Sequence, residues 1–299
     1  YDVKLKQARL DRLTCYGKFS FHKLDIADSN AISELFSRND FELVVNFAAQ
    51  AGVRYSIENP KAYVEANLVG FSNIIESCWR YRVSHFIYAS SSSVYGASDQ
   101  LPFSETDAVD RPVSLYAATK KANELIAHTY SHLHKMRTTG LRLFTVYGPW
   151  GRPDMAIFRF AQGILEGAPI PVYNQGEMLR DFTYIDDIIE GVIRVIDKLS
   201  DVGLNDLSSS EAPNYQIYNI GNSRPVSLTR FIRALENALG KKALLNLLPL
   251  QPGDVRATAA DVSRLVADFD YHPKVTVEEG VHRFVEWYCN YYDVNLAAR

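Results

Sequence analysis

The chain of 299 residues is long enough to form one large domain or two modest domains with buried cores. A net charge of −3, with no basic run interleaved with aromatic residues, excludes a nucleic-acid-binding surface. The three cysteines and seven histidines show no metal-ligand spacing, and no apolar run is long enough to span a bilayer. We therefore expect a cytoplasmic globular protein with reduced cysteines, without a metal site and without a membrane segment.

Apolar runs alternate with helical patterns through the first half of the chain. Residues 41–49, 85–90 and 140–146 are predicted to be buried strands, and the first two follow helical stretches at residues 29–38 and 66–81. Ser114 is a suitable N-cap for a further helix, whose buried side we expect to continue through Leu125 and Ile126. This alternation predicts an α/β fold with a doubly wound parallel sheet, whose ligands bind at the carboxyl ends of the strands.

The alternation ends after residues 148–153. Helices are predicted at residues 158–165, 186–199 and 228–239, strands at 170–173 and 216–220, and an irregular loop at 204–214. Gly240 marks the end of the last helix. We expect one domain from residues 1–148 plus about 182–221, and a smaller, mixed C-terminal domain from residues 149–181 plus about 222–299.

Tyr116 and Lys120 carry the strongest chemical signal. Residues four apart lie on one face of a helix, one turn from each other, so a lysine there can lower the pKa of the tyrosine. The serines at residues 90–93 are predicted to follow a strand, where a hydroxyl could bind the same substrate oxygen. Such a set suits proton transfer to or from an alcohol, which suggests carbonyl–alcohol redox chemistry.

The chain resembles the extended short-chain dehydrogenase/reductase family, and within it the nucleotide-sugar epimerases and dehydratases. The resemblance covers nearly the whole chain and rests on motifs in the family's order, namely Asn46-Phe47-Ala48-Ala49, Asn67-Leu68-Val69-Gly70, Ser90 to Gly96, Tyr116-x-x-x-Lys120, Leu141 to Pro149 and Arg180-Asp181-Phe182-x-Tyr184-Ile185-x-Asp187. It implies a Rossmann dinucleotide-binding domain followed by a nucleotide-sugar-binding domain, tightly held NAD, a UDP-sugar substrate and a homodimer.

One departure from the family concerns the first residues. The family opens with a strand, a glycine-rich phosphate loop, a helix and a second strand, whereas no Gly-x-x-Gly-x-x-Gly occurs in the first 50 residues here. Residues 1–10 resemble the segment that comes after the second strand in the family. We therefore expect the first strand–helix–strand to be missing from this chain, and with it the contact that distinguishes NAD from NADP.

The resemblance assigns residues to the catalytic and cofactor sites. Tyr116 would act as the base at a sugar 4-hydroxyl, Lys120 would support it, and Ser91 would bind the developing oxyanion. Besides Tyr116 and Lys120, the residues expected near the dinucleotide are Asp25, Ile26, Phe47, Ala48, Ala49, Asn67 and Tyr147.

The residues beside Ser91 separate the subfamilies. Sugar 4,6-dehydratases carry an Asp-Glu pair after the catalytic Ser/Thr, and glucuronate decarboxylases commonly have a glutamate there, whereas this chain has Ser92 and Ser93. The pattern looks like that of UDP-glucuronate 4-epimerases. Another UDP-hexose 4-epimerase, a UDP-glucuronate decarboxylase and a non-catalytic dinucleotide-sensing scaffold remain alternatives. The expected substrate-binding residues are Ser91, Ser92, Ser93, Thr145, Arg54, Val172, Tyr173, Arg180 and Asp254. The product would feed surface polysaccharide synthesis.

Overall fold

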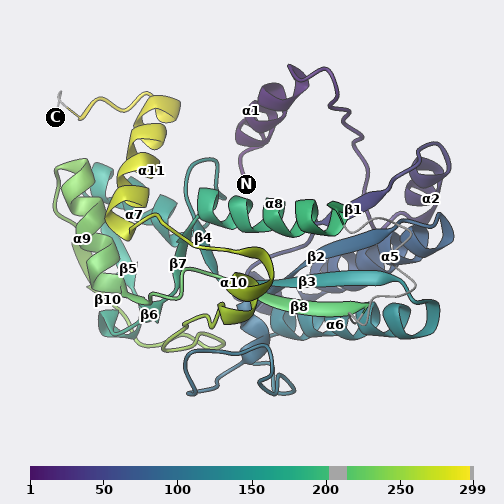
Figure 1. Cartoon of the computed structure of the whole chain (residues 1–299). Helices are drawn as coiled ribbons and strands as arrows, with labels where there is room; N and C mark the ends of the chain where they lie inside the picture. The colour runs from purple at the N-terminus through teal and green to yellow at the C-terminus, as the bar shows by residue number, and fades with distance from the viewer. Residues whose placement is uncertain (202–213, 297–299) are drawn as a thin grey trace.

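A parallel four-stranded sheet organises the first part of the molecule, of which a computed structural model describes residues 1–201 and 214–296 (Figure 1). The neighbouring strands all run parallel, which requires crossover connections between them. The predicted α/β fold with a parallel sheet is confirmed. In spatial order the strands are β1 (Leu43–Asn46), β2 (His85–Ser91), β3 (Arg137–Leu143) and β8 (Tyr215–Ile220).

Helices cover both faces of this sheet (Figure 1). Phe86 and Tyr88 of β2 share one buried cluster with residues of the helices on one face, and Ile87 belongs to a second cluster on the other. This division follows from the alternation of side chains along a strand. The first face carries α2 (Ser29–Ser37), α5 (Phe71–Arg80) and α6 (Leu115–His134), and the second carries α8 (Ile185–Asp201) and α10 (Ser263–Phe269).

The helix predicted at residues 66–81 begins earlier and changes its hydrogen-bond pattern. After α3 (Tyr55–Glu58), the chain forms α4 (Pro60–Tyr63), a π-helix (Val64–Gly70) and then α5 without a break. π-Helical turns are rare and occur frequently at functional sites. Here the wide turn contains Asn67, which is 1% exposed.

A second, smaller part of the molecule has its own hydrophobic core, built around Phe231 and Phe284. Its elements include α7 (Ala156–Glu166), β5 (Pro169–Val172), β6 (Leu179–Arg180), β9 (Val226–Ser227), α9 (Leu228–Leu239), β10 (Leu244–Leu247) and α11 (Val277–Tyr292). Helix α9 ends at Gly240 in the left-handed conformation, as predicted. Strand β5 pairs parallel with β10, and β6 pairs antiparallel with β9.

The two cores do not divide the chain where the sequence suggested. Leu265 and Phe269 of α10 pack in the cluster on the sheet, although we expected them in the second part. Conversely, Tyr147, Phe182 and Tyr184 belong to the core of the second part. They lie in β4 (Thr145–Tyr147) and β7 (Phe182–Tyr184), which pair parallel with each other.

Two buried aspartates join the segments between the two cores. The Asp181 carboxylate accepts hydrogen bonds from the main-chain N–H groups of Asn222, Ser223 and Ala260 at 2.7–3.0 Å. The Asp187 carboxylate accepts from the N–H groups of Lys274 and Val275 at 3.1 and 3.0 Å. Each carboxylate therefore fixes chain segments that are remote in the sequence.

The first helix, α1 (Val3–Thr14), lies apart from the sheet in Figure 1. The Arg9 guanidinium donates to the Gly151 carbonyl at 2.8 Å, and Arg12 lies over the Trp150 ring at 4.6 Å. Helix α1 therefore braces the segment that follows β4.

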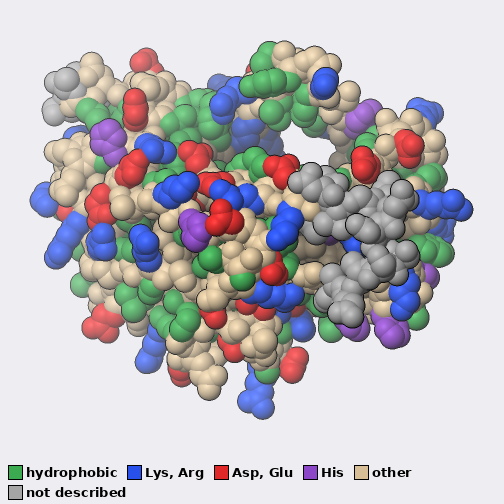
Figure 2. All heavy atoms as spheres, in the orientation of Figure 1, with side chains coloured by type: hydrophobic (Ala, Val, Ile, Leu, Met, Phe, Trp, Pro, Cys, Tyr) green, Lys and Arg blue, Asp and Glu red, His purple; other side chains and the backbone are tan. Residues whose placement is uncertain are grey.

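Cations and anions are interspersed over the face shown in Figure 2, in keeping with the small net charge. Within the described ranges, no helix has both the length and the apolar character that crossing a bilayer requires. The irregular loop predicted at residues 204–214 lies, except for its last residue, outside the described residues.

Candidate functional site

Ser91 and Tyr116 meet at the carboxyl end of β2. Ser91 is the last residue of that strand. The Ser114 hydroxyl accepts a hydrogen bond from the Ala117 N–H at 3.1 Å, so Ser114 is the predicted N-cap of α6. This cap starts the helix one residue before Tyr116, and the phenol lies close enough to the Ser91 side chain for that side chain to lower its pKa.

The electrostatics of Tyr116 differ from the expectation. Burial raises the pKa of Tyr116, while the hydrogen bond from Ser91 and the charge of Arg152 lower it. The Lys120 ammonium instead donates to the main-chain carbonyl of Ala89 at 2.8 Å. Burial lowers the pKa of Lys120 to about 8, because the side chain is only 4% exposed. The predicted pair therefore shares one helix face, but Ser91 and Arg152 act on the phenol.

Arg152 is a candidate site residue to which the sequence analysis gave no role. Its side chain approaches Gly52, as does the Tyr63 hydroxyl, and its charge lowers the pKa of both Tyr63 and Tyr116. The Tyr63 and Tyr116 rings meet edge to face at 6.1 Å. Asp154 holds the Arg152 guanidinium with two hydrogen bonds, at 2.7 and 3.1 Å. Residue patterns alone do not indicate this role, because the effect of the Arg152 charge on Tyr116 depends on the fold.

Small side chains with hydroxyl groups lie at the same carboxyl end of the parallel sheet. Ser91 donates to the Ser93 hydroxyl at 3.1 Å, and Ser92 and Ser93 are half-buried. Thr145, also half-buried, follows Leu143 by two residues, and Leu143 pairs directly with Ser91 across β2 and β3. The four predicted hydroxyl residues therefore lie at neighbouring strand ends, where they can donate hydrogen bonds to an anionic group.

A second predicted cluster spans the two parts of the molecule. Arg54 donates to the Asp254 carboxylate at 3.1 Å and lies over the Tyr173 ring at 4.2 Å. Arg180 donates to the main-chain carbonyls of Val255 and Arg256, and the charges of Asp254 and Arg54 both affect its pKa. Arginine side chains held in this way suit phosphate oxygens. The Asp181 and Asp187 carboxylates bind main-chain N–H groups instead of Arg180.

Val172 lies in this region, but its side chain is not available to bind a ligand. The side chain is fully buried in the core of the second part, and the main-chain carbonyl accepts from Leu248 at 2.9 Å. The side chain therefore shapes the segment that ends at Tyr173 without reaching a ligand.

Several residues predicted near the dinucleotide lie beside the end of β1. Phe47 is 42% exposed, Ala48 is exposed and Ala49 is half-buried, so this segment presents apolar and small side chains. Asp25 is also exposed, and its carboxylate accepts from the Ala27 N–H at 2.9 Å. Ile26 packs against Gly70 of the π-helix. Exposed small residues at a strand end, with a carboxylate nearby, fit the nucleoside parts of NAD.

Asn67 and Tyr147 do not fit direct contact through their side chains. The Asn67 amide binds both main-chain groups of Gln50, at 2.7 and 2.9 Å, and donates to the Thr119 hydroxyl at 3.0 Å. Tyr147 is 5% exposed in the core of the second part, and its hydroxyl donates to the Thr276 carbonyl at 3.4 Å. We therefore correct both expectations: Asn67 joins the loop after β1 to α6, and Tyr147 packs the second core.

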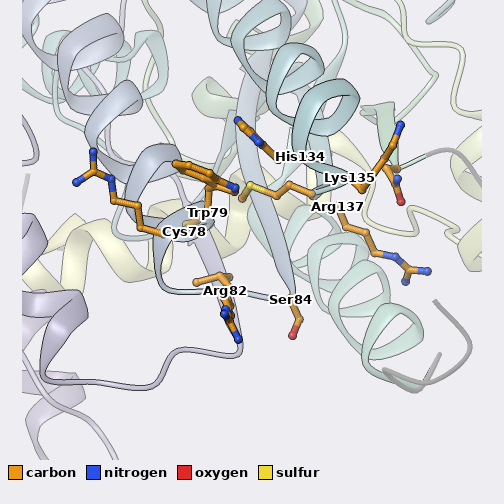
Figure 3. A pocket seen from close by; sticks show the side chains of 11 residues that line it. Cys78, Trp79, Arg82, Ser84, His134, Lys135 and Arg137 are labelled. Atoms are coloured by element: carbon orange, nitrogen blue, oxygen red, sulfur yellow. The ribbon is translucent and has the colours of Figure 1, made fainter. Parts of the chain in front are cut away.

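A basic hollow lies at the opposite end of the sheet. It is lined by residues that include Trp79, Arg82, His134 and Arg137, at the amino ends of β2 and β3 (Figure 3). Ligands of open parallel sheets bind at the carboxyl ends of the strands, where Ser91 lies. The hollow is therefore separate from the candidate active site. Among the described residues, no group of three His, Cys, Asp or Glu side chains could hold a metal ion.

Comparisons with known proteins agree with this geometry. The model of the NAD dependent epimerase/dehydratase family matches residues 3–221. Protein CapI of Staphylococcus aureus is 52% identical over 98% of this chain and 89% of its own length, and a probable UDP-glucuronate 4-epimerase of Rhizobium meliloti is 46% identical over 98% and 87%. The crystal structure of a Bacillus cereus UDP-glucuronic acid 4-epimerase with UDP-glucuronic acid and NAD is 31% identical, with a TM-score of 0.86 over 97% of this chain and 87% of that one.

The Arg152 charge predicts a change in the pH profile. In Arg152→Gln, the pKa of Tyr116 rises because a positive charge that lowers it is removed. A base must be deprotonated to act, so the acid limb of kcat/KM should move to higher pH. The measurement is the pH dependence of kcat/KM for a nucleotide-sugar substrate. Arg159→Gln, on the exposed side of α7, is the matched control, and equal profiles for the two variants would contradict the assignment.

Proposed function

Because the chain belongs to the NAD-dependent epimerase/dehydratase family, we propose that it catalyses the 4-epimerisation of UDP-glucuronate to UDP-galacturonate. The observation that carries the proposal is the placement of Ser91 at the carboxyl end of β2 close enough to Tyr116 to lower its pKa, beside hydroxyl side chains and a cluster of arginines. The Rhizobium meliloti and Bacillus cereus relatives support the same substrate. The three described cysteines are free, which is in keeping with a reaction in the cytoplasm.

In this reaction Tyr116 takes the proton from the sugar 4-hydroxyl and later returns it. NAD, when bound, would supply the hydride acceptor and donor for C4, and epimerisation requires that the hydride return to the opposite face of that carbon. Ser91 donates a hydrogen bond to the oxygen as negative charge develops there. Lys120, held by the Ala89 carbonyl, keeps a cation below the helix turn that carries Tyr116. Ser92 and Ser93 supply neither the acid nor the base that dehydration requires.

The arginine cluster would hold the UDP part of the substrate. Arg54 and Arg180 provide guanidinium groups for the diphosphate, and the Tyr173 ring and the Asp254 carboxylate keep Arg54 in place. At the other end, Thr145 and the hydroxyls of residues 91–93 would bind the sugar carboxylate. A 4-keto uronic acid is a β-keto acid, which loses CO₂ readily, so fixing the charged carboxylate protects the sugar.

The direct test is incubation of the purified protein with UDP-glucuronate and NAD. We expect UDP-galacturonate to form without accumulation of NADH, as followed by chromatography and near-ultraviolet absorbance. Tyr116→Phe should lower kcat by a factor of about 10²–10⁴, because proton transfer loses its base. Conversion of UDP-glucose alone would instead support a different UDP-hexose epimerase. A UDP-pentose as the main product would support a decarboxylase, and no turnover by protein that is shown to bind NAD would support the sensing scaffold.

Thr145 tests the binding of the carboxylate. Thr145→Val should raise the fraction of pentose by-product by about 2- to 10-fold, because it removes one hydrogen bond with a net value of about 0.5–1.5 kcal/mol. The ratio of UDP-pentose to UDP-galacturonate is the measurement. Thr106→Val, at an exposed loop position, is the control. A product ratio unchanged by Thr145→Val would remove Thr145 from the carboxylate site.

The assembly we propose is a homodimer through α5 and α6, which pack on each other. Leu125 and Leu133 of α6 are 56% and 64% exposed, and Trp79 of α5 is 41% exposed. Leu125 thus lies outside the buried side on which the sequence placed it. Exposed apolar side chains on adjacent helices are typical of an interface. A dimer of this enzyme would supply galacturonate units for surface polysaccharide.

Negative charges introduced on the exposed apolar surface of α6 should dissociate the dimer. We expect Leu125→Glu/Leu133→Glu to have the mass of a monomer in size-exclusion chromatography with light scattering, because each carboxylate would be desolvated at the interface. Leu244→Glu, on the exposed strand β10, should leave the mass unchanged. A double variant with the mass of the parent protein would place the interface elsewhere.

A further inference from the structure

Three consecutive residues of β2 bind three residues of α6 that are spaced by four. The Ser91 side chain lies beside Tyr116 and lowers its pKa, the Ala89 carbonyl accepts from the Lys120 ammonium, and the Ser90 hydroxyl donates to the Glu124 carboxylate at 2.7 Å. A spacing of four places Tyr116, Lys120 and Glu124 along one side of the helix. Glu124 is the member of this series that lies deepest, with no exposed surface.

Glu124 also forms a buried ion pair with the next strand. Arg142 of β3 donates to the two carboxylate oxygens of Glu124 from Nε and one terminal nitrogen, at 2.8 and 3.0 Å, and Arg142 is 3% exposed. Lys121 approaches the same carboxylate at 3.5 Å. The planar fork of the arginine fixes both the position and the rotation of the carboxylate.

The network continues from Arg142 to the turn that follows Ser91. Arg142 donates to the Tyr95 hydroxyl at 3.0 Å, and that hydroxyl donates to the Asn219 amide oxygen of β8 at 2.6 Å. Tyr95 ends the short helix that begins directly after Ser91. The pair is therefore connected to both sides of the Ser91–Tyr116 contact, through α6 on one side and through the turn after β2 on the other.

Stability alone does not account for such a pair. Taking two charges out of water costs several kcal/mol per ion, and replacing a buried ion pair by apolar residues of similar volume is often neutral or stabilising. Directional bonds, unlike apolar contacts, define one register between helix and strand. A shift of about 1 Å in that register would change the rate by about 10²-fold.

We propose that Glu124 is a positioning residue, which together with Arg142 sets the register of α6 on β2 and thereby the contact between Ser91 and Tyr116. The inference rests on the proposed function only for its kinetic readout. Glu124 does not touch the substrate, and it acts through the helix that carries Tyr116 and Lys120. Its loss should lower kcat and leave KM nearly unchanged, because the arginine cluster that holds the nucleotide lies elsewhere.

The test replaces the pair rather than one partner, since a single substitution leaves a buried charge. Glu124→Leu/Arg142→Met should match or exceed the parent protein in free energy of unfolding, measured in urea, yet lose about 10- to 100-fold in kcat with KM within about 3-fold. The acid limb of kcat should move to higher pH, because the Ser91 hydrogen bond lowers the pKa of Tyr116. Glu190→Leu/Arg194→Met, an ion pair on α8, is the matched control and should keep the parent kcat.

A second readout does not depend on the substrate. The Tyr116 phenol is titrated by near-ultraviolet difference absorbance against the Tyr116→Phe background, and its pKa should be higher in Glu124→Leu/Arg142→Met than in the parent protein. If the parent protein does not turn over UDP-glucuronate, the proposed function fails, and this titration still decides the positioning role. The positioning role would be overturned if a stable double variant had the same kcat and the same pKa of Tyr116 as the parent protein.

Ser90→Ala provides an independent arm should the double variant not fold. It removes one hydrogen bond to Glu124 and leaves the ion pair in place. We expect a smaller fall in kcat, about 2- to 10-fold. The pKa of Tyr116 should shift in the same direction, upward. An unchanged kcat together with an unchanged titration in Ser90→Ala would also overturn the proposal.

Discussion

The hydrogen bond from the Lys120 ammonium to the Ala89 carbonyl constrains the candidate active site more than any other single contact. Lowering the pKa of this lysine from 10.5 to about 8 corresponds to a cost on the order of 3 kcal/mol for keeping the charge buried. The fold must supply that energy through other contacts of α6. The N-cap at Ser114, the ion pair of Glu124 with Arg142 and the bond from Asn67 to Thr119 all tie this helix to its surroundings. A cation can lie under Tyr116 only because the helix cannot move away from the strand.

The same requirement explains why the site lies between two cores. The sheet provides Ser91 and, through α6, Tyr116, whereas Tyr173, Arg180 and Asp254 come from segments outside it. Their separation is fixed by Asp181 and Asp187, whose carboxylates bind main-chain N–H groups of remote segments. A carboxylate buried among N–H donors is strongly favoured over one left unpaired. These bonds therefore fix the distance between the Ser91–Tyr116 site and the arginine cluster.

The sequence predicted the parts of this site that depend on local patterns. The strand predicted at residues 85–90, which the structure extends to Ser91, the cap at Ser114 and the i, i+4 pair of Tyr116 and Lys120 follow from residue type and spacing alone. Contacts between remote segments could not be predicted in this way: Arg54 and Asp254 are 200 residues apart, and the effect of the Arg152 charge on Tyr116 depends on how the two segments fold together. Leu125 was placed in the core because apolar residues usually are, while Glu124 beside it is fully buried. A helix that presents polar residues to the sheet and apolar residues such as Leu125 to the surface reverses the usual amphipathic pattern.

Charge balance links the site to its proposed substrate. Arg54 pairs with Asp254, and Arg152 pairs with Asp154, so neither arginine lacks an anion in the free protein. UDP-glucuronate brings a diphosphate and a carboxylate, so its binding exchanges one set of anions for another instead of neutralising bare cations. Exchange of this kind favours a ligand whose charges match the arginines in position. A misplaced anion interacts less favourably with the arginine than the aspartate that it displaces. The position of Arg54 and Arg180, more than the number of arginines, would therefore select the diphosphate end of a nucleotide sugar, while Thr145 and the hydroxyls of residues 91–93 would bind its carboxylate end.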